Sequence, residues 1–491
     1  MPTGNLDHIF RSAAALFADK VAVESAETAL SYADLDSDID KVAAGLHAEG
    51  VVPGDILGMA VADGLRFVTA LFAIWRIGAT PAPLDAWAKP AEVDGFADRL
   101  RLRGVVADLP AFRCSVCPVL MVAELKNTAA GAAMAAGELL ETVPAYIALT
   151  SGTTGRPRAA ALTTVQLYAR FTSHIINRFG GPDDRFLATL PMRFGGMRTH
   201  VLARLLTGGT VIFHPTMFAP WEIADSIQRL KVKSVFLVPA VVRQLLDLAE
   251  GGQPFFPGLS RLDCSGDFML PDEKRAALRR LTPGFHECYG ATAGGVISIL
   301  APEDIEAHAE SVGRPAQHVL VQIVDESDKP QEPGETGRLR FFTPGNVTAY
   351  LDDDEPDNEM ADDVASGWAY PGDLAALDAD GFLHLRGRAA DIIIRGGANI
   401  FPAEIEEVVA GHPDIREVCA VGWPSTSLGE EIVLFVVAGG ETDQAAIRSF
   451  CRANLGPQKQ PKEIIILDAL PRNANGKVVR RDLAATLPAR D

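Results

Sequence analysis

Two spacings of apolar residues alternate along the N-terminal part of the chain. Segments whose apolar residues recur every three or four positions are separated by short, continuous apolar runs that end at glycine, proline or polar residues. The expected helices are 35–49, 66–77, 221–230 and 240–248, and the expected buried strands are 56–61, 146–149, 210–213 and 234–238. Strands that alternate with helices predict an α/β fold in layers, with largely parallel sheets.

The pattern changes at about residue 310. Short runs with strand character follow one another at 319–325, 337–342 and 381–385, and turn residues such as Pro333-Gly334 separate them. This spacing predicts a β-rich subdomain made of hairpins, at about residues 310–389.

A last segment mixes both kinds of element. Its expected helices are 403–410 and 443–453, and its expected strands are 418–421 and 432–437. A boundary is expected near Arg388–Asp391, where a hairpin stops and a new unit begins. The chain is therefore predicted to divide into a large N-terminal part, residues 1–389, and a small α+β C-terminal part, residues 390–491.

Composition excludes several classes of protein. Of the 491 residues, 48% are hydrophobic and 22% are charged, which is ordinary for a globular protein. The 45 Lys+Arg and 64 Asp+Glu give a net charge of −19, so neither nucleic acid nor a membrane surface is expected as a partner. Arg66 and Arg76 break the apolar stretch around 67–84 well short of the ~18 residues of a membrane span, and no signal peptide is recognised. A soluble, cytoplasmic protein is expected.

Cysteine is sparse, with six residues spread along the chain. Cys114 and Cys117 form one C-x-x-C pair, but no second pair and no nearby histidine accompany it. Two buried or half-buried thiols are therefore favoured over a zinc or redox site.

A glycine- and hydroxyl-rich segment follows the predicted strand 146–149. Two glycines let the backbone approach an anion closely, and hydroxyl and amide donors can surround phosphate oxygens. Arginines at the end of the segment add positive charge, and a polar surface turn is the alternative interpretation. The residues concerned are Thr150, Ser151, Gly152, Thr153, Thr154, Gly155, Arg156 and Arg158.

This segment resembles the phosphate-binding loop of the adenylate-forming acyl-CoA synthetase superfamily. Further matches follow in the order of that family, and together they cover essentially the whole chain. They are Tyr289-Gly290-Ala291-Thr292, Gly372-Asp373, Gly387-Arg388, Gly396-Gly397, Glu404-Ile405-Glu406 and Gly476-Lys477.

The resemblance implies activation of a carboxylic acid with ATP and Mg²⁺ to an acyl adenylate, followed by thioester formation with coenzyme A. It implies catalytic roles for Lys477, Thr292 and Arg388, with Lys477 presented by the C-terminal part acting as a mobile lid. It places ATP and coenzyme A against the phosphate loop and a set of further residues, with Thr153 near the metal. That set is Gly266, Asp267, Tyr289, Gly290, Ala291, Asp373, Gly396 and Gly397.

The acid is expected beside the segment that follows Leu190-Pro191. Arg193, Phe194, Gly195 and Met197, together with Phe236, are the candidate substrate-binding residues, although the apolar ones equally suit a plain core. Arg193 and Arg198 are suited to bind the second carboxylate of a dicarboxylic acid.

Four positions depart from the family pattern: Arg158 replaces a lysine, Ala293 the glutamate that helps to hold Mg²⁺, Pro371 a threonine, and Ala390 the charged hinge residue. Two alternatives therefore stay open. One is an adenylating enzyme that loads the phosphopantetheine of an acyl carrier protein. The other is a catalytically silent, nucleotide-binding homologue. A monomer or a homodimer is expected.

Overall fold

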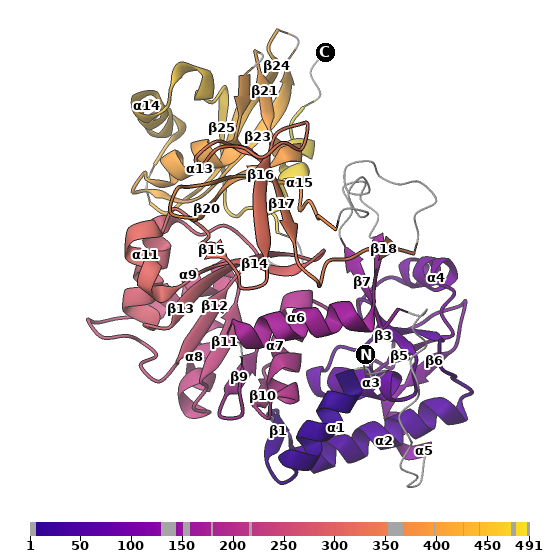
Figure 1. Cartoon of the computed structure of the whole chain (residues 1–491). Helices are drawn as coiled ribbons and strands as arrows, with labels where there is room; N and C mark the ends of the chain where they lie inside the picture. The colour runs from indigo at the N-terminus through magenta and orange to yellow at the C-terminus, as the bar shows by residue number, and fades with distance from the viewer. Residues whose placement is uncertain are drawn as a thin grey trace.

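The computed structural model describes residues 6–128, 144–150, 158–177, 180–215, 219–351, 367–396, 398–425, 427–440, 442–472 and 478–488. A nine-stranded sheet forms the centre of the N-terminal part (Figure 1). In spatial order its strands are β15 (Arg314–Pro315), β14 (Gly295–Leu300), β13 (Phe285–Ala291), β12 (Arg261–Cys264), β11 (Ser234–Leu237), β9 (Arg185–Ala188), β10 (Thr210–Phe213), β1 (Val21–Glu24) and β2 (Ala29–Ser31).

Six neighbouring strands of this sheet, from β13 to β1, run parallel. The loops that follow β11, β12 and β13 therefore emerge at one edge of the sheet, which is where α/β proteins place their ligands. Phe236 lies near the end of β11 itself, and the three loops carry Val238, Gly266 and Thr292. The parallel α/β prediction is confirmed for this part of the chain.

Two smaller sheets complete the N-terminal layers. The first is parallel and contains β4 (Thr80–Pro83), β3 (Ile56–Ala60), β5 (Gly104–Ala107) and β6 (Val119–Met121). The second is antiparallel and contains β18 (Ala349–Tyr350), β8 (Arg158–Leu162) and β7 (Tyr146–Thr150).

Helices cover these sheets, and α6 runs across the middle of the molecule toward β7 and β18 (Figure 1). None of the described helices is long and apolar enough to cross a membrane. The helices are α1 (Leu6–Leu16), α2 (Tyr32–Ala48), α3 (Gly64–Arg76), α4 (Pro90–Arg99), α5 (Val122–Thr128), α6 (Thr164–Ile176), α7 (Gly195–Leu206), α8 (Pro220–Arg229), α9 (Pro239–Leu248), α10 (Pro271–Ala276), which the π-helical turn η1 (Ala277–Leu281) extends, and α11 (Pro302–His308).

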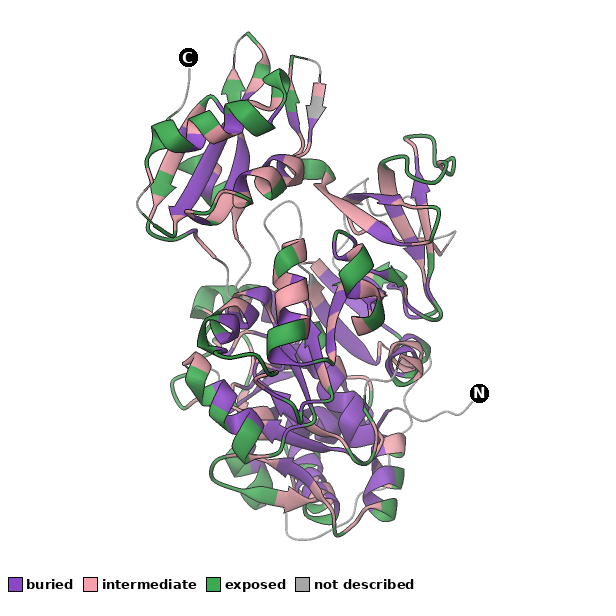
Figure 2. Ribbon diagram, turned by 90° about the vertical axis from the view of Figure 1, so that its left-hand side faces the viewer, coloured by how far each residue is buried: buried purple, intermediate pink, exposed green. Residues whose placement is uncertain are grey.

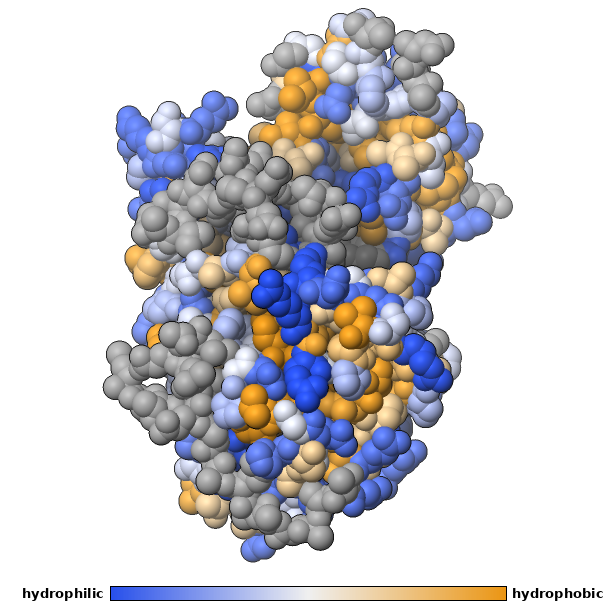
Figure 3. All heavy atoms as spheres, turned by 90° about the vertical axis from the view of Figure 1, so that its right-hand side faces the viewer, coloured by the Kyte–Doolittle hydropathy of each residue, from blue (hydrophilic) through white to orange (hydrophobic). Residues whose placement is uncertain are grey.

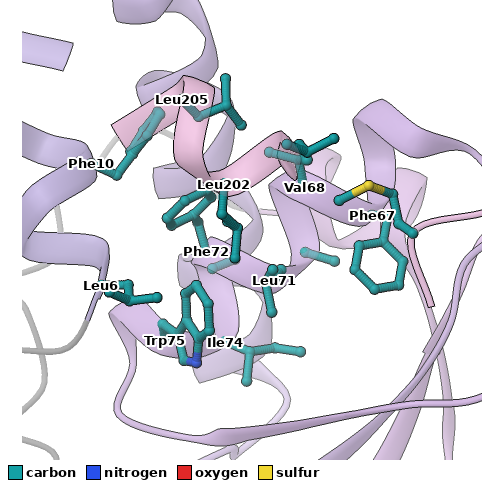
Figure 4. Close-up of a cluster of buried hydrophobic side chains, with 14 of the residues drawn as sticks. Leu6, Phe10, Phe67, Val68, Leu71, Phe72, Ile74, Trp75, Leu202 and Leu205 are labelled. Atoms are coloured by element: carbon teal, nitrogen blue, oxygen red, sulfur yellow. The ribbon is translucent and has the colours of Figure 1, made fainter. Parts of the chain in front are cut away.

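The main apolar core lies where α3 packs against α1 and α7. The face of α3 carries large side chains at helical spacing, and Phe72, Trp75 and Phe10 meet with Leu202 and Leu205 from α7 (Figure 4). Phe10 and Phe72 have ring centroids 4.5 Å apart. This rigid core fixes α7, whose N-terminal end reaches the predicted acid-binding segment.

The β-rich subdomain is a four-stranded antiparallel sheet of β16 (Leu320–Val324), β17 (Gly337–Phe342), β19 (Asp373–Leu377) and β20 (Leu383–Arg388). The sequence placed its last strand at 381–385, whereas β20 begins later. The Asp378 carboxylate accepts the backbone N–H groups of Asp380 and Phe382, and Gly381 adopts a φ of 82°. These contacts make 378–382 a tight turn and delay the strand.

The C-terminal part has its own sheet, β22 (Ala398–Ile400), β21 (Ile393–Arg395), β24 (Gly429–Ala438), β23 (Ile415–Ser425) and β25 (Glu463–Leu467). Helices α13 (Pro402–Ala410), α14 (Gln444–Asn454) and α15 (Arg480–Ala485) accompany it. Its central strands are buried beneath more exposed elements (Figure 2). A single 3₁₀ turn, η2 (Ala389–Asp391), joins this unit, below called the lid, to β20.

Candidate active site

Three of the predicted nucleotide-binding residues meet at one point. The Tyr289 hydroxyl, at the end of β13, donates a hydrogen bond to the Asp373 carboxylate. On the neighbouring hairpin Asp373 is the cross-strand partner of Arg388, whose Nε lies 3.4 Å from Oδ1 of Asp373. Burial, followed by the Asp373 charge, raises the pKa of Tyr289, so its hydroxyl stays a donor. The group offers an aromatic face, a carboxylate that accepts hydroxyl protons, and a cation.

The hairpin between β13 and β14 holds the next three predicted residues. A Cβ on Gly290 would lie 2.5 Å from the Gly295 carbonyl oxygen, so only glycine fits there. Ala291 pairs with Gly295, and Thr292 is exposed at the tip of the hairpin. This places the Thr292 hydroxyl at the open edge of the sheet, as a phosphate ligand requires.

Ala293, by contrast, points into the β-rich subdomain. It is 6% exposed and belongs to an apolar cluster with Ile297 and Phe341. Its carbonyl oxygen accepts hydrogen bonds from Arg170 Nη2 (2.7 Å) and from the Val347 N–H (2.8 Å). The position therefore serves packing and holds an arginine in place.

The loop after β12 faces the lid. Gly266 adopts a φ of 108°, a conformation that favours glycine, and turns the chain so that Asp267 lies 3.6 Å from Arg472 of the lid. Arg472 also binds Glu417 at 2.7 Å. Asp267, Glu417 and Arg472 line a cavity of about 110 Å³ between the loop and the lid. In this structure Asp267 is thus directed at the lid.

The predicted acid-binding residues surround the N-terminal end of α7. Phe194 is its N-cap, Gly195 is exposed in the first turn, and Met197 is fully buried in the main core. Phe236, at the end of β11, is 8% exposed, and a Cβ on Gly196 would lie 3.3 Å from its ring. Phe194 and Phe236 are therefore the apolar candidates for contact with an acid at this end of α7. Met197 belongs to the core beneath them.

Arg193 stacks over the Phe194 ring, 4.4 Å from its centroid, and pairs with Asp85 at 3.3 Å. Burial lowers the pKa of Arg193 and the Asp85 charge opposes that shift.

On the face of the molecule that carries β7, β18 and α4, strongly hydrophilic side chains lie among hydrophobic ones (Figure 3).

The lid presents its own predicted residues near the hinge. Gly396 adopts a φ of 60° at the turn between β21 and β22, and its N–H donates to the Leu428 carbonyl. Arg480 lies 3.4 Å from Asp391 in η2 and also pairs with Glu406 of α13. Arg480 thereby ties the hinge turn to the body of the lid.

Some predicted residues lie outside the described part of the chain. They are Ser151, Gly152, Thr153, Thr154 and Gly155 of the phosphate loop, and Gly397 and Lys477 of the lid. The flanks of the phosphate loop are described: Thr150 pairs with Arg158 in the β7–β8 hairpin, and the Arg158 guanidinium stacks 3.9 Å above the Tyr350 ring.

Sequence reasoning missed residues whose partners are distant along the chain. Asp85 neutralises Arg193, and Arg472 bridges Asp267 and Glu417. His200 lies three positions beyond Met197, the last candidate residue of the acid-binding segment. Its ring centroid is 4.8 Å from that of Phe236. For His200 the available signal was its helical spacing from Met197. No local pattern in the sequence indicated the roles of Asp85 and Arg472.

The fold and these contacts define a class: an α/β enzyme that holds a nucleotide at the carboxyl edge of a parallel sheet, beneath a small lid. The AMP-binding enzyme family matches residues 10–351, and the AMP-binding enzyme C-terminal domain matches residues 404–477. The chain belongs to the AMP-binding enzyme family.

Individual relatives match nearly end to end. An indoleacetate–CoA ligase of Aromatoleum aromaticum is 30% identical over 96% of both chains. ATP-bound MatB of Rhodopseudomonas palustris is 26% identical, with a TM-score of 0.87 over 98% of this chain and 99% of that one. O-succinylbenzoate coenzyme A synthetase (MenE) of Bacillus subtilis, in complex with ATP and magnesium ion, is 25% identical, with a TM-score of 0.83 over 97% and 98%.

These findings confirm the predicted family, fold class and reaction class. The protein is an AMP-forming acid–thiol ligase that uses ATP, Mg²⁺ and coenzyme A on a small carboxylic acid.

The side chains of the described site suit a magnesium ion that is already bound to ATP when it enters. Among the described residues, no three His, Cys, Asp or Glu side chains are grouped so as to hold a metal. Mg²⁺ commonly keeps several waters and takes its other ligands from substrate phosphates. Thr292, exposed at the tip of the β13–β14 hairpin, is a described residue whose hydroxyl would be available to join them.

Proposed function

We propose that Tyr289, Asp373 and Arg388 bind the adenosine end of ATP, and that Phe194 and Phe236 flank the acyl group. The convergence of Tyr289, Asp373 and Arg388 from three strands carries this proposal. Asp373 accepts hydrogen bonds from the two ribose hydroxyls, and Arg388, 3.4 Å away, orients that carboxylate. Residues 1–389 form the part that binds ATP and acid, and residues 390–491 form the moving lid.

The reaction has two steps. An oxygen of the substrate carboxylate attacks the α-phosphorus of ATP, the bond to pyrophosphate breaks, and an acyl adenylate forms. The sulfur of coenzyme A then attacks the acyl carbon, AMP departs with the electrons of the broken bond, and the thiol proton passes to water. Mg²⁺ supplies charge neutralisation on the phosphates when bound.

The first step joins two anions, so it depends on positive charge and positioning. Lys477, brought in by the lid, supplies the charge at the reacting carboxylate and α-phosphate. In the second step the lid turns at Ala390 and presents the hairpin at Gly396-Gly397 to the thiol.

We favour an aromatic acid and coenzyme A itself over a carrier protein. Two relatives act on aromatic acids as their names state, indoleacetate and O-succinylbenzoate, and both names specify coenzyme A. The aromatic side chains of Phe194 and Phe236 are suited to stack on such a group. The enzyme acts as a monomer or homodimer, which light scattering measures.

The test is exchange of labelled pyrophosphate into ATP across a panel of aromatic and aliphatic acids. Mass spectrometry then detects the thioester formed with coenzyme A or with a holo carrier protein. Exchange without transfer to coenzyme A, but with transfer to the carrier protein, would replace the proposed acceptor. ATP binding without exchange for any acid would support a silent homologue instead.

The role of Lys477 is tested separately. Lys477→Ala is expected to slow adenylation on the order of 10²- to 10³-fold, while thioester formation from a supplied acyl adenylate continues. Lys462→Ala, an exposed lid lysine, is the charge-matched control. Equal loss in both half-reactions would contradict the role given to Lys477.

A further inference from the structure

Two arginines behind the acid-binding segment are held without a carboxylate. Arg170, on α6, donates from Nε to the Gly345 carbonyl (2.8 Å) and from Nη2 to the Ala293 carbonyl (2.7 Å). Arg198, on α7, is 7% exposed, donates from Nη1 to the Arg193 carbonyl (3.3 Å), and stacks 4.1 Å above the Tyr146 ring. All of these acceptors are neutral.

No acidic side chain in the described part of the chain forms an ion pair with either arginine. Burial, reinforced by the charge of Arg198, lowers the pKa of Arg170 to about 10, and burial also lowers the pKa of Arg198. Removing a cation from water without an anion costs several kcal/mol. Within the described part of the chain, the two guanidinium groups therefore have no negative partner.

A third polar group faces the same place. Tyr146 is 1% exposed, and its hydroxyl has no hydrogen-bond partner among the described residues. Burial raises the pKa of Tyr146 to about 12, and the charges of Arg198, which stacks over its ring, and of Arg170 act against that shift. A protonated phenol beside two guanidinium groups provides only donors and positive charge, which is the recognition chemistry of a carboxylate.

The cluster adjoins the acid-binding segment. Side chains of a helix lean toward its N-terminus, and Arg198 Nη2 comes within 3.7 Å of the Cβ position of Gly195, which is exposed beside Phe194. The N-terminal end of the 12-residue α7 adds positive potential there. Arg193 does not contribute a free charge, because Asp85 neutralises it.

We propose that Arg198, Arg170 and Tyr146 bind the second carboxylate of a dicarboxylic acid whose first carboxylate is activated. This inference rests on the proposed function and names its class of substrate: an acid with a carboxylate at the end remote from the reacting one. Arg198 and Tyr146 are the specificity-determining residues, and Arg170 holds the hairpin carbonyl while adding charge.

The experiment compares matched acids in pyrophosphate exchange. Each pair differs only in the terminal carboxylate: alkanoic acids against α,ω-diacids of the same length, and phenylalkanoic acids against their carboxyphenyl counterparts. The best diacid is expected to exceed its monoacid partner in kcat/KM on the order of 100-fold, because charged hydrogen bonds to a buried cation are lost with the monoacid. Monoacids that exchange as well as every diacid would overturn the inference and leave the proposed function intact.

Two variants separate recognition from structure. Arg198→Met keeps the length of the side chain, and Tyr146→Phe removes only the unpartnered hydroxyl. Both are expected to reduce the diacid-to-monoacid ratio, Arg198→Met to near one and Tyr146→Phe by several-fold. The Tm of unliganded Arg198→Met is expected to equal or exceed that of the wild type, since an uncompensated buried charge is removed. A lower Tm, with equal loss for both kinds of acid, would show a merely structural arginine.

Binding is measured without catalysis by thermal shift of the full chain with the diacids alone. A rise in Tm with wild type, absent with Arg198→Met and Tyr146→Phe, supports the site even if no acid supports exchange. Chloride is the competing occupant. A chloride-dependent rise in Tm that Arg198→Met abolishes, with no further rise from any diacid, would assign the cluster to an inorganic anion and overturn the proposal.

Discussion

Arg472 of the lid lies 3.6 Å from Asp267, which stands on the loop after β12 in the N-terminal part. The pair joins the N-terminal part to the lid, across the boundary that the proposed lid movement would alter. Both side chains are 23% exposed, so solvent weakens the attraction but does not abolish it. Arg472 lies five positions before Lys477 in the sequence, so we expect the contact to favour the lid orientation proposed for adenylation.

Asp267→Asn is therefore expected to slow adenylation by about two- to five-fold, the effect of a partly exposed ion pair. Thioester formation from a supplied acyl adenylate is expected to be unchanged or slightly faster. Single-turnover measurements of both half-reactions check this. Asp272→Asn is the control, because that carboxylate also pairs with an arginine but is 96% exposed within the N-terminal part. A uniform reduction of both steps by Asp267→Asn would exclude a role in lid orientation.

The Tyr289–Asp373–Arg388 group leads to a second prediction. Asp373→Asn removes the charge that Arg388 neutralises and replaces one of the two acceptor oxygens by an NH2 donor, so that Tyr289 and the ribose hydroxyls compete for the oxygen that remains. The Kd for ATP is expected to rise on the order of 10- to 100-fold, as for a lost charged hydrogen bond. Tyr289→Phe retains the aromatic face and is expected to weaken binding less. Isothermal titration measures both.

The control for this pair is Asp378→Asn, which lies at the turn of the same β19–β20 hairpin and binds His384 at 2.8 Å. It tests whether loosening the hairpin suffices to weaken ATP binding. If it raises the Kd as much as Asp373→Asn does, the effect belongs to the hairpin and not to the ribose contact.

The sequence predicted most of the elements well, and three of the residues that it singled out, Tyr289, Asp373 and Arg388, meet in the fold. Apolar spacing located α2, β3, α3, β10 and β11 to within a few residues, because each buries one stripe or one short run in a single core. Strand β20 was displaced because Asp378 caps the preceding turn through backbone hydrogen bonds, which apolar spacing does not record.

The acid end was less predictable because its contacts join distant parts of the chain. Arg193 and Arg198 look equivalent in sequence, yet Asp85 neutralises one and leaves the other facing Tyr146 and Arg170. Ala293 was expected to concern the metal, whereas its carbonyl positions Arg170. Only the folded arrangement reveals which arginine has no acidic partner among the described residues.

The buried histidines predict how stability depends on pH. His174 and His200 are 5% and 2% exposed, and Arg204 Nη1 lies 2.9 Å from Nδ1 of His200. Burial, and then the Arg204 charge, lowers the pKa of His174 to about 3 and that of His200 far below its usual value. Below a pH of about 6.5 these two histidines become protonated in the unfolded chain, but they stay neutral in the folded protein.

Stability is therefore expected to be full above pH 6.5 and to fall as the pH decreases, by up to ~1.4 kcal/mol per pH unit for each histidine. Urea unfolding at pH 7.5, 6.5 and 5.5 measures the slope. His174→Gln is expected to reduce the slope by up to ~1.4 kcal/mol per pH unit, whatever it does to stability at pH 7.5, whereas His8→Gln on the exposed face of α1 serves as control. An unchanged slope in His174→Gln would show that this histidine titrates in the folded protein.

The hairpin that carries Thr292 offers a prediction that depends on geometry alone. A Cβ on Gly290 would lie 2.5 Å from the Gly295 carbonyl oxygen, a backbone atom that cannot move without opening the hairpin. Gly290→Ala is therefore expected to displace Thr292 and to reduce pyrophosphate exchange by 10-fold or more, on the order of what small misplacements of reacting groups cost. Gly95→Ala is the matched control, because its Cβ meets nothing within 4 Å and it lies inside α4, where alanine is the better helix former. That variant is expected to keep full activity and to gain slightly in Tm. Normal exchange by Gly290→Ala would mean that the close fit of the two strands does not position the phosphate ligand.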